Sequence, residues 1–174
     1  MRAVVSTVAT ASVVVDGEVV GHVDADRDGA GRGALLALVG AGRDDDPEAW
    51  ATVARKIAEL RILPPAGESW ESGRDVSAQD NGAEVLVVSQ FTLMGATAKG
   101  RRPSWSPAAP GEQAAEVLEK FVDELRSRGM RGDTGRFGAM MEVSSTNLGP
   151  YTLIIEALSR PPPPHWCNSF RGRT

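Results

Sequence analysis

The sequence contains few of the residues on which crosslinks and catalytic centres usually depend. Of its 174 residues only Cys167 is a cysteine, which excludes a disulfide framework and a cysteine-rich metal site. That usage fits a reducing compartment, and we expect a cytoplasmic protein. The two histidines, His22 and His165, are distant in the sequence, and no pairing of histidine with carboxylates suggests a metal site. We therefore expect no metal, no other cofactor and no conventional hydrolase triad.

Long hydrophobic runs are also lacking. The longest, residues 34–39 and 85–88, are far shorter than the ~20 apolar residues that span a bilayer. The N-terminal stretch alternates valine with polar residues and is too polar for a secretory signal. We therefore expect no membrane partner. With 41% hydrophobic and 24% charged residues, the chain has an ordinary globular composition and is long enough to bury a core.

No excess of positive charge is present either. The formal net charge is −4, which argues against a general nucleic-acid-binding protein and predicts no DNA partner. The charge is unevenly distributed: residues 44–48 are acidic, whereas Lys99, Arg101 and Arg102 form a basic cluster. This cluster predicts a small local contact with phosphate groups, for which a solvated loop is an equal alternative.

Strands are predicted from β-branched runs that are bounded by turn residues. The clearest signal is Asp16-Gly17, which supplies the positive φ angles of a two-residue hairpin turn between residues 13–15 and 18–20. The other predicted strands cover residues 2–9, 34–41, 84–92, 139–146 and 151–157.

Two main helices are predicted from apolar residues spaced three or four apart. The first has Asp46 as its N-cap and Pro47 at its first position, and the second covers residues 110–128. The positions expected to face the core are Trp50, Val53, Ile57 and Leu60 in the first helix and Val117, Phe121, Val122 and Leu125 in the second. Residues 64–83 between them are predicted to form a long loop.

Helices that follow separated groups of strands favour an α/β fold with a curved, barrel-like sheet over a regular βαβ repeat. One domain, residues 1–158, accounts for all of these elements. The remaining residues, 159–174, include four consecutive prolines and are predicted to form a flexible C-terminal tail.

Two segments, each a strand leading into a polar turn, are the most informative in the chain. They are Ser89-Gln90-Phe91-Thr92-Leu93 and Asn147-Leu148-Gly149-Pro150-Tyr151-Thr152. Taken alone, the first is more simply a core strand and the second a plain Gly-Pro turn. Together they resemble the S-Q-F-T-L and N-x-G-P-V-T segments of the D-aminoacyl-tRNA deacylase family. Residues 1–5, 99–104 and 134–138 share this resemblance, which extends to about residue 156.

The resemblance implies the fold of that family and an enzyme that hydrolyses the ester of D-aminoacyl-tRNA and glycyl-tRNA, as chiral proofreading in translation. Backbone amides of Phe91 and Thr92 would polarise the ester carbonyl, while Ser89, Gln90 and the Thr92 side chain shape the catalytic pocket. The neighbouring 2′-hydroxyl of the substrate would assist the attack. Such an ester needs no acid–base pair from the protein, although the same shortage is expected of a protein without activity.

Gly149 and Pro150, with Asn147, would bind the amino acid of the substrate. In the family, this Gly-Pro pair enters the pocket of the other subunit, so the resemblance implies a homodimer. The carbonyl oxygens of the pair would hold the amino group of the substrate and exclude L side chains.

The remaining contacts with aminoacyl-tRNA are assigned to two places. Phe137 would contact the terminal adenosine, although a single phenylalanine is more often a core residue. Lys99, Arg101 and Arg102 would bind phosphates of the acceptor stem.

The chain departs from the family pattern around Gly149-Pro150. Thr7 stands where an arginine is expected to brace that segment, so we expect the brace to be absent, and Tyr151 replaces the usual valine. The Gly-Pro-Tyr-Thr order is similar to an animal branch that holds the Gly-Pro bond trans and removes L-alanine from mischarged threonine tRNA. Two alternatives therefore stay open: a relaxed deacylase that accepts small L-residues, and a catalytically silent tRNA- or protein-binding module.

Overall fold

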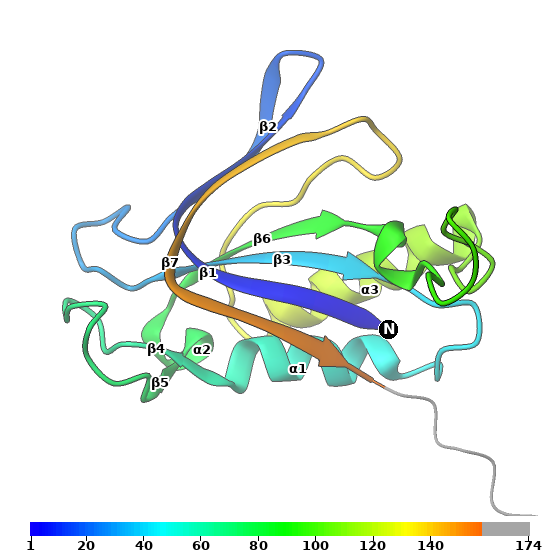
Figure 1. Ribbon diagram of the computed structural model, residues 1–174. Coiled ribbons are helices and arrows are strands. Elements are labelled where there is room, and N and C mark those ends of the chain that lie inside the picture. The colour runs from blue at the N-terminus through cyan, green and yellow to red at the C-terminus, as the bar shows by residue number, and fades with distance from the viewer. Residues whose placement is uncertain (158–174) are drawn as a thin grey trace, which may run out of the picture.

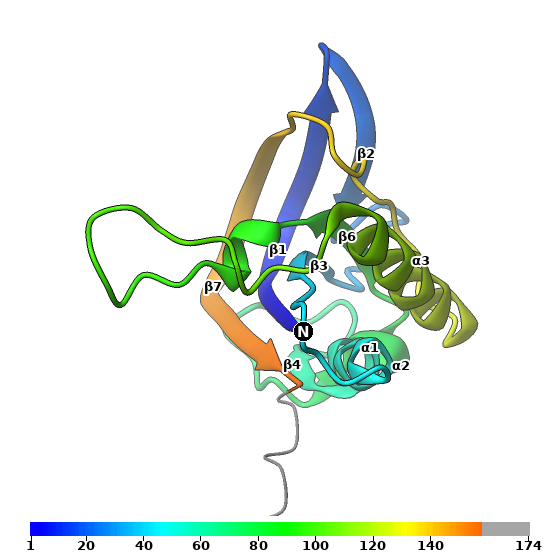
Figure 2. The same ribbon diagram turned by 90° about the vertical axis from the view of Figure 1, so that its right-hand side faces the viewer.

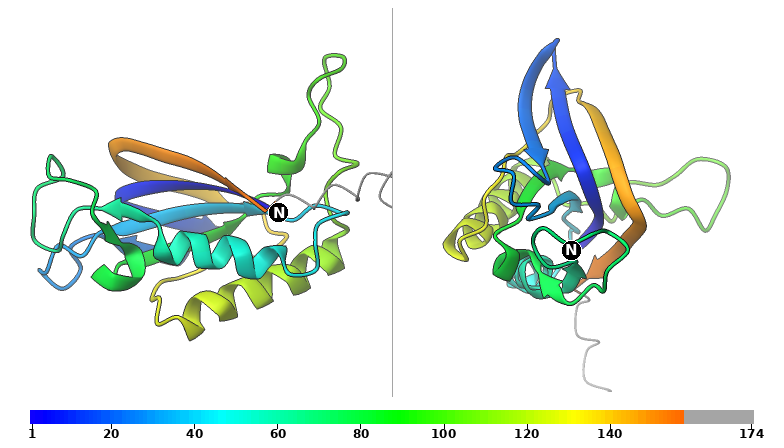
Figure 3. Two further views of the ribbon diagram at one scale, coloured as in Figure 1. Left: turned by 90° about the horizontal axis from the view of Figure 1, so that it is seen from below. Right: turned by 90° about the vertical axis from the view of Figure 1, so that its left-hand side faces the viewer.

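A computed structural model describes residues 1–157 as a strongly curled sheet with two long helices against one face (Figures 1 and 3). The five strands of the sheet are β1 (Arg2–Val15), β2 (Glu18–Asp24), β3 (Ala34–Gly40), β6 (Glu84–Ser89) and β7 (Glu142–Glu156). The two long helices are α1 (Ala49–Glu59) and α3 (Gly111–Ser127). The predicted α/β class with a curved sheet and two main helices is therefore confirmed. The predicted tail lies outside the described residues, and the domain boundary stays a prediction.

The strand around which the sheet curls is β1. It pairs antiparallel with β7 along residues 2–14. Its residues 2–8 also pair with β3 and its residues 10–15 with β2, both antiparallel. Because β1 outlasts β3, its second half forms a curved arm together with β2 and the first half of β7 (Figure 2).

The tip of this arm confirms the predicted hairpin. The φ angles of Asp16 and Gly17 are 52° and 81°, and β1 and β2 end on either side of them. Positive φ at both central residues is the requirement of a type I′ turn, which an Asp-Gly pair satisfies at low cost.

One long strand, β7, replaces the two strands predicted for residues 139–146 and 151–157. Gly149 and Pro150 do not end the strand, because pairing with β1 continues on both sides of them. Ser6 lies opposite Thr152 and Val8 lies opposite Asn147. Residues 148–151 therefore form a bulge opposite the single residue Thr7.

The parallel pair β3 and β6 lies at the other edge of the sheet, joined by a crossover that contains α1. The far edge of β6 is covered by residues 131–135, whose backbone exchanges hydrogen bonds with Val85 and Val87. Gly132 makes this approach possible, because a Cβ there would overlap the Val85 carbonyl and its φ is 141°. The crossover also contains β4 (Arg61–Leu63), β5 (Val76–Ser77) and the short helix α2 (Ala78–Asn81). Of these, β5 and α2 lie within residues 64–83, where the sequence predicts only a loop.

The first helix starts later than the sequence predicts. Asp46 is not its N-cap but closes a turn before it, where the carboxylate accepts the Glu48 N–H and the carbonyl accepts the Ala49 N–H. The helix then ends at Glu59, so Leu60 lies beyond it and is exposed, contrary to its predicted core position.

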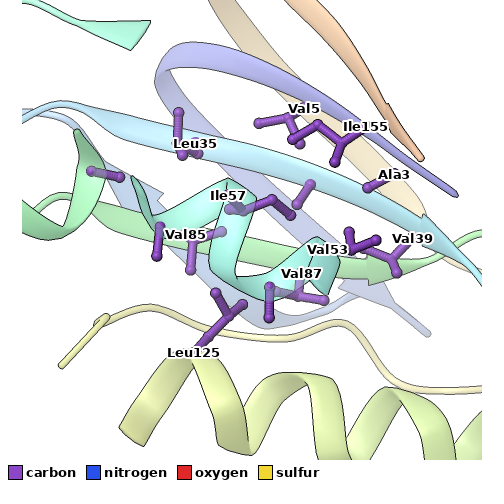
Figure 4. Close-up of a cluster of buried hydrophobic side chains, with 14 of the residues drawn as sticks. Ala3, Val5, Leu35, Val39, Val53, Ile57, Val85, Val87, Leu125 and Ile155 are labelled. Carbon is purple, nitrogen blue, oxygen red and sulfur yellow. The ribbon is translucent and has the colours of Figure 1, made fainter. Parts of the chain in front are cut away.

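The main core lies between one face of the sheet and the two helices (Figure 4). Val53 and Ile57 of α1 and Leu125 of α3 point toward side chains of β1, β3, β6 and β7. As predicted, Phe121 and Leu125 are buried, and Val117 and Val122 pack at the edge of the same cluster. Within residues 1–157, no helix is both long and apolar enough to cross a membrane.

Candidate functional site

The first signature segment forms a sharp turn rather than the end of a strand. The predicted strand over residues 84–92 stops at Ser89, and Phe91–Met94 form the 3-10 helix η1. Gln90 makes the last ladder contact by donating its N–H to the Val39 carbonyl at 2.7 Å. Its carbonyl then accepts the Leu93 N–H at 3.2 Å, which turns the backbone away from the sheet.

This turn leaves two backbone donors unused. In the part of the chain that the structure describes, neither the Phe91 N–H nor the Thr92 N–H has a hydrogen-bond acceptor. The first N–H groups of any helix lack partners within it, and here no side chain caps them. The Thr92 hydroxyl accepts a hydrogen bond from the Gln90 side-chain amide, so these two side chains constrain each other.

An apolar cavity of about 270 Å³ opens beside this turn, at the carboxyl ends of β3 and β6 and against the start of α3. Ser89, Gln90 and Phe91 line it together with Phe137, so the fold brings two separate predicted segments to one place. Phe137 is 44% exposed, which excludes the alternative that it is a core residue. Thr92 borders the turn but does not line the cavity.

Among residues 1–157, no carboxylate, histidine, lysine or arginine side chain lines this cavity. The most deeply buried carboxylate of the described residues, Glu84, lies at the opposite end of β6, where it pairs with the Arg27 Nε atom at 2.7 Å. The hydrogen bond from Arg27 and the charge of Glu84 raise the pKa of the Arg27 guanidinium. That pair lies away from the cavity, so the polar groups that the described residues offer around the turn include the free backbone N–H groups of Phe91 and Thr92.

Three contacts hold the turn in position. Gly40 packs so closely under it that a Cβ at Gly40 would lie 2.8 Å from the Gln90 carbonyl oxygen. Arg2 donates to the Leu93 carbonyl at 2.6 Å and also pairs with Glu156 of β7. Phe91 meets Trp105 edge to face, with ring centroids 5.5 Å apart.

The predicted basic residues lie in a long loop that projects beyond this end of the molecule (Figure 3). Lys99, Arg101 and Arg102 are all exposed, and the two sides of the loop are joined by paired hydrogen bonds between Ala96 and Ser104. Trp105 follows directly and connects the loop to Phe91 at the mouth of the cavity. The loop therefore places positive charge near the cavity without lining it.

The second signature segment does not line the cavity of the same chain. Asn147 is exposed, and its side-chain oxygen accepts a hydrogen bond from Ser145. Gly149 has a φ of 128° in the bulge opposite Thr7. Val39 lines the cavity and pairs with Ala3 of β1, and Thr7 lies four residues further along β1. At about 3.3 Å per residue, the bulge is therefore about 13 Å from the cavity along the strand.

Thr7 occupies the position that the sequence leaves without a brace. It is only 1% exposed, and its hydroxyl contacts the Leu148 carbonyl at 2.6 Å and the Tyr151 carbonyl at 3.5 Å, on either side of Gly149-Pro150. The arginine brace of the family is absent here, as expected from the sequence, and the Thr7 hydroxyl supports the bulge from the same position. Sequence reasoning also missed Arg2 and Trp105, since only the fold brings them to the turn.

The chain is thus an α/β protein with a curled sheet, and its candidate site is an apolar cavity beside two unpaired backbone donors. The chain belongs to the D-Tyr-tRNA(Tyr) deacylase family, because the sequence model of that family matches residues 4–156.

Relatives of known name agree with this assignment. A D-aminoacyl-tRNA deacylase of Corynebacterium urealyticum is 56% identical to this chain, with 90% of this chain and 99% of the relative covered. Those of Corynebacterium glutamicum and Thermobifida fusca are 54% and 48% identical at the same coverage.

Two solved structures have the same fold. One, described as a c-Myc DNA unwinding element binding protein, superposes with a TM-score of 0.78 at 31% identity and covers 91% of this chain and 100% of its own. The other, described as a probable eukaryotic D-amino acid tRNA deacylase, has a TM-score of 0.68, covers 90% of this chain and 98% of its own, and shares the fold at 15% identity.

Proposed function

We propose that this protein hydrolyses the ester bond of D-aminoacyl-tRNA and of glycyl-tRNA, and so acts in chiral proofreading during translation. The observation that carries the proposal is the pair of unused N–H groups of Phe91 and Thr92 beside a cavity without acid–base side chains. The family membership and the shared name of the relatives support the same reaction.

In this mechanism the ester carbonyl oxygen lies within reach of the two N–H groups. Water adds to the carbonyl carbon, the oxygen gains negative charge, and the backbone donors stabilise that charge. One such donor typically lowers the barrier by about 2.7–4 kcal/mol. The carbon–oxygen ester bond then breaks, which releases the amino acid and leaves a hydroxyl on the terminal ribose. The adjacent 2′-hydroxyl of that ribose assists the attack, so the protein needs no general base.

Stereochemical selection is assigned to Gly149 and Pro150 of the partner subunit in a homodimer. Two features support this assignment: the segment is a bulge that the Thr7 hydroxyl contacts, and it lies away from the cavity of its own chain. Backbone carbonyls at the cavity would hold the amino group and leave no room for an L side chain. Asn147 and Phe137 would complete the binding of the substrate.

The acceptor stem of the tRNA is assigned to the projecting loop. Lys99, Arg101 and Arg102 would contact phosphates, where flexible charged side chains act without reading the sequence. A small basic footprint on an acidic protein gives modest, salt-dependent binding. A role in translation implies a cytoplasmic protein, with aminoacyl-tRNA as its proposed partner.

The two alternatives raised by the sequence gain no support from the relatives. A relaxed deacylase for small L-residues and a silent binding module both share the scaffold, but the relatives are named D-aminoacyl-tRNA deacylases. The joint presence of Gln90, Phe91, Thr92, Gly149 and Pro150 also favours an enzyme over a silent module.

The proposal is tested by hydrolysis of four substrates without added metal: D-Tyr-tRNA, Gly-tRNA, L-Ala-tRNA and L-Tyr-tRNA. We expect rapid loss of the first two and sparing of the L-substrates. Cleavage of L-Ala-tRNA would identify the relaxed deacylase, and binding of tRNA with no cleavage of any substrate would identify the silent module.

Three variants separate backbone from side-chain catalysis. Gly40→Ala pushes on the Gln90 carbonyl and displaces the turn, so we expect kcat to fall about 100-fold, as when one oxyanion donor is removed. Thr92→Ala keeps the backbone and is expected to cost less than about tenfold. Gly31→Ala is the steric control, because a Cβ there would also crowd backbone, 3.1 Å from the Gly67 nitrogen, but before the start of β3 and away from the cavity. Equal losses in Thr92→Ala and Gly40→Ala would contradict backbone catalysis.

A further inference from the structure

Three side chains from two distant parts of the chain form a stack beside the bulge. The Arg74 guanidinium carbon lies 5.2 Å from the centre of the Trp70 ring and 5.7 Å from the centre of the Tyr151 ring. Trp70 and Arg74 belong to the segment between β4 and β5, whereas Tyr151 is the last residue of the bulge in β7. The stack therefore connects the crossover segment to the residue next to Pro150.

Arg74 has little else to bind. Its Nη1 atom donates to the Ser72 carbonyl at 2.9 Å, and its Nε atom is buried without a hydrogen-bond partner in the described residues. Nor does any carboxylate of residues 1–157 approach it closely enough for an ion pair. A guanidinium placed in this way interacts mainly with the two aromatic faces, and such contacts are stronger where water is excluded.

The bulge depends on support of this kind. Residues 148–151 are outside the ladder of hydrogen bonds between β1 and β7, and Gly149 has a backbone conformation that L-residues rarely adopt. The Thr7 hydroxyl reaches the carbonyls at the two ends of the bulge. The Tyr151 ring contacts Arg74 of the crossover segment, and Tyr151 directly follows Pro150. The crossover segment can therefore influence the position of Gly149 and Pro150 through the Tyr151 side chain.

We infer that Arg74 is a positioning residue for stereochemical selection: it holds the Tyr151 ring and thereby fixes the Gly149-Pro150 segment that excludes L side chains. This inference rests on the proposed function. It assigns no contact with the substrate to Arg74, and its effect passes entirely through Tyr151.

One test reads this contact without any measurement of activity. The sequence contains a single tyrosine, so ¹³C-labelled tyrosine gives one ring signal in NMR spectra of the protein. Arg74→Met keeps an apolar stem but removes the guanidinium, and we expect it to shift that signal. Arg55→Met is the matched control, since Arg55 is exposed on α1 and pairs with Glu59. An unmoved signal in Arg74→Met would overturn the inference.

A second test measures the ratio of kcat/KM for D-Tyr-tRNA to that for L-Tyr-tRNA. We expect the ratio to fall about tenfold in Arg74→Met and in Tyr151→Leu, which corresponds to one cation–π interaction. The double variant should show no larger fall than either single variant, because both remove the same interaction. Arg74→Lys, which keeps the cation, should restore much of the ratio, and Arg55→Met should leave it unchanged.

These outcomes are distinguishable from a failure of the proposed function. If the unmodified protein leaves D-Tyr-tRNA intact, the proposed function fails, and the NMR signal still reports whether Arg74 holds Tyr151. If the unmodified protein is selective and Arg74→Met has an unchanged ratio, or if the effects in the double variant add, the positioning role is wrong. A merely structural role would lower the melting temperature and leave the ratio unaffected.

Discussion

At the scale of single residues, Thr7 has an unusual task. One buried hydroxyl lies opposite four backbone residues, 148–151, and contacts the carbonyls that flank Gly149 and Pro150. A hydroxyl carries one donor, so the 2.6 Å contact with Leu148 is the hydrogen bond and the 3.5 Å contact with Tyr151 is weaker. The position of the bulge is therefore coupled to a single side chain of β1.

Replacing Thr7 by valine tests this coupling, because valine keeps the shape of threonine and removes the hydroxyl. We expect Thr7→Val to lower the free energy of unfolding by about 1–3 kcal/mol, since the Leu148 carbonyl is left without its partner. Urea titration measures this change. Thr7→Ser, which keeps the hydroxyl, serves as the control and should keep most of the stability. A Thr7→Val protein as stable as the unmodified one would show that the bulge is supported elsewhere.

At the scale of elements, α3 is attached to the sheet by a narrow apolar stripe. Most residues of its 17-residue length are partly or fully exposed, and only Phe121 and Leu125 are buried. Because α3 also forms one wall of the cavity, the packing of Phe121 supports both the fold and the site.

Truncation of Phe121 should therefore be severe. We expect Phe121→Ala to reduce the free energy of unfolding by about 3–5 kcal/mol, because it removes a fully buried ring and leaves a cavity. Glu119→Ala on the exposed face of the same helix is the control and should change stability by less than about 0.5 kcal/mol. Thermal unfolding monitored by circular dichroism compares the two, and equal stabilities would contradict the role of the apolar stripe.

Local sequence signals predicted the elements that local physics determines. The Asp16-Gly17 turn and the apolar stripe of α3 were both readable, because each depends on neighbours within a few residues. That β7 is a single strand could not be predicted, because a Gly-Pro pair usually indicates a turn. The strand continues on both sides of this pair only because it is paired with β1. The end of β6 at Ser89 likewise depends on Gly40 and Arg2 from other strands.

The same distinction holds for the site. Ser89, Gln90, Phe91 and Phe137 line one cavity, and the resemblance to the family had implied that all four belong to the substrate site. The resemblance drew attention to position 7 but not to the contacts that Thr7 makes there, and it gave no indication of Arg74. Each acts through a partner that is distant in the sequence, and neither residue type alone indicates such a role.

At the scale of the whole molecule, one chain leaves apolar side chains uncovered on β7 and before it. Ile154 is 68% exposed, and Met140 and Val143 are exposed as well. These side chains support the proposed homodimer, in which the bulge of one subunit completes the cavity of its partner. The cavity and the bulge of one chain are also separate, which supports a dimer in which each cavity meets the bulge of the other subunit.

Mixing two inactive variants tests this assembly. Gly40→Ala displaces the cavity turn, and Gly149→Ala distorts the bulge, because its Cβ would lie 2.6 Å from the Tyr151 nitrogen. Subunits of the two variants, exchanged at equal concentration, should regain about a quarter of the activity, since half of the dimers are mixed and each has one intact site. Each variant alone is the control. No recovery in mixtures that contain mixed dimers would contradict a shared site.

The basic loop predicts how binding responds to salt. Replacement of Lys99, Arg101 and Arg102 by glutamine should raise KM and leave kcat unchanged, because these side chains bind substrate and transition state equally. The slope of log KM against log salt should fall by about 2 to 3, since each phosphate that is no longer neutralised keeps its counterion. Arg55→Gln on α1 is the control, and an unchanged slope in the triple variant would place the tRNA elsewhere.

The main-chain origin of the donors at Phe91 and Thr92 has a consequence for how mutation data on this protein should look. Alanine keeps the N–H that stabilises the charge in the proposed mechanism, so a survey by alanine replacement would rank the proposed reactive centre as tolerant. Intolerance would instead concentrate at glycines such as Gly40, where any side chain moves the backbone of the turn. In a map of harmful substitutions, the outline of this site would therefore be drawn by the residues that have no side chain.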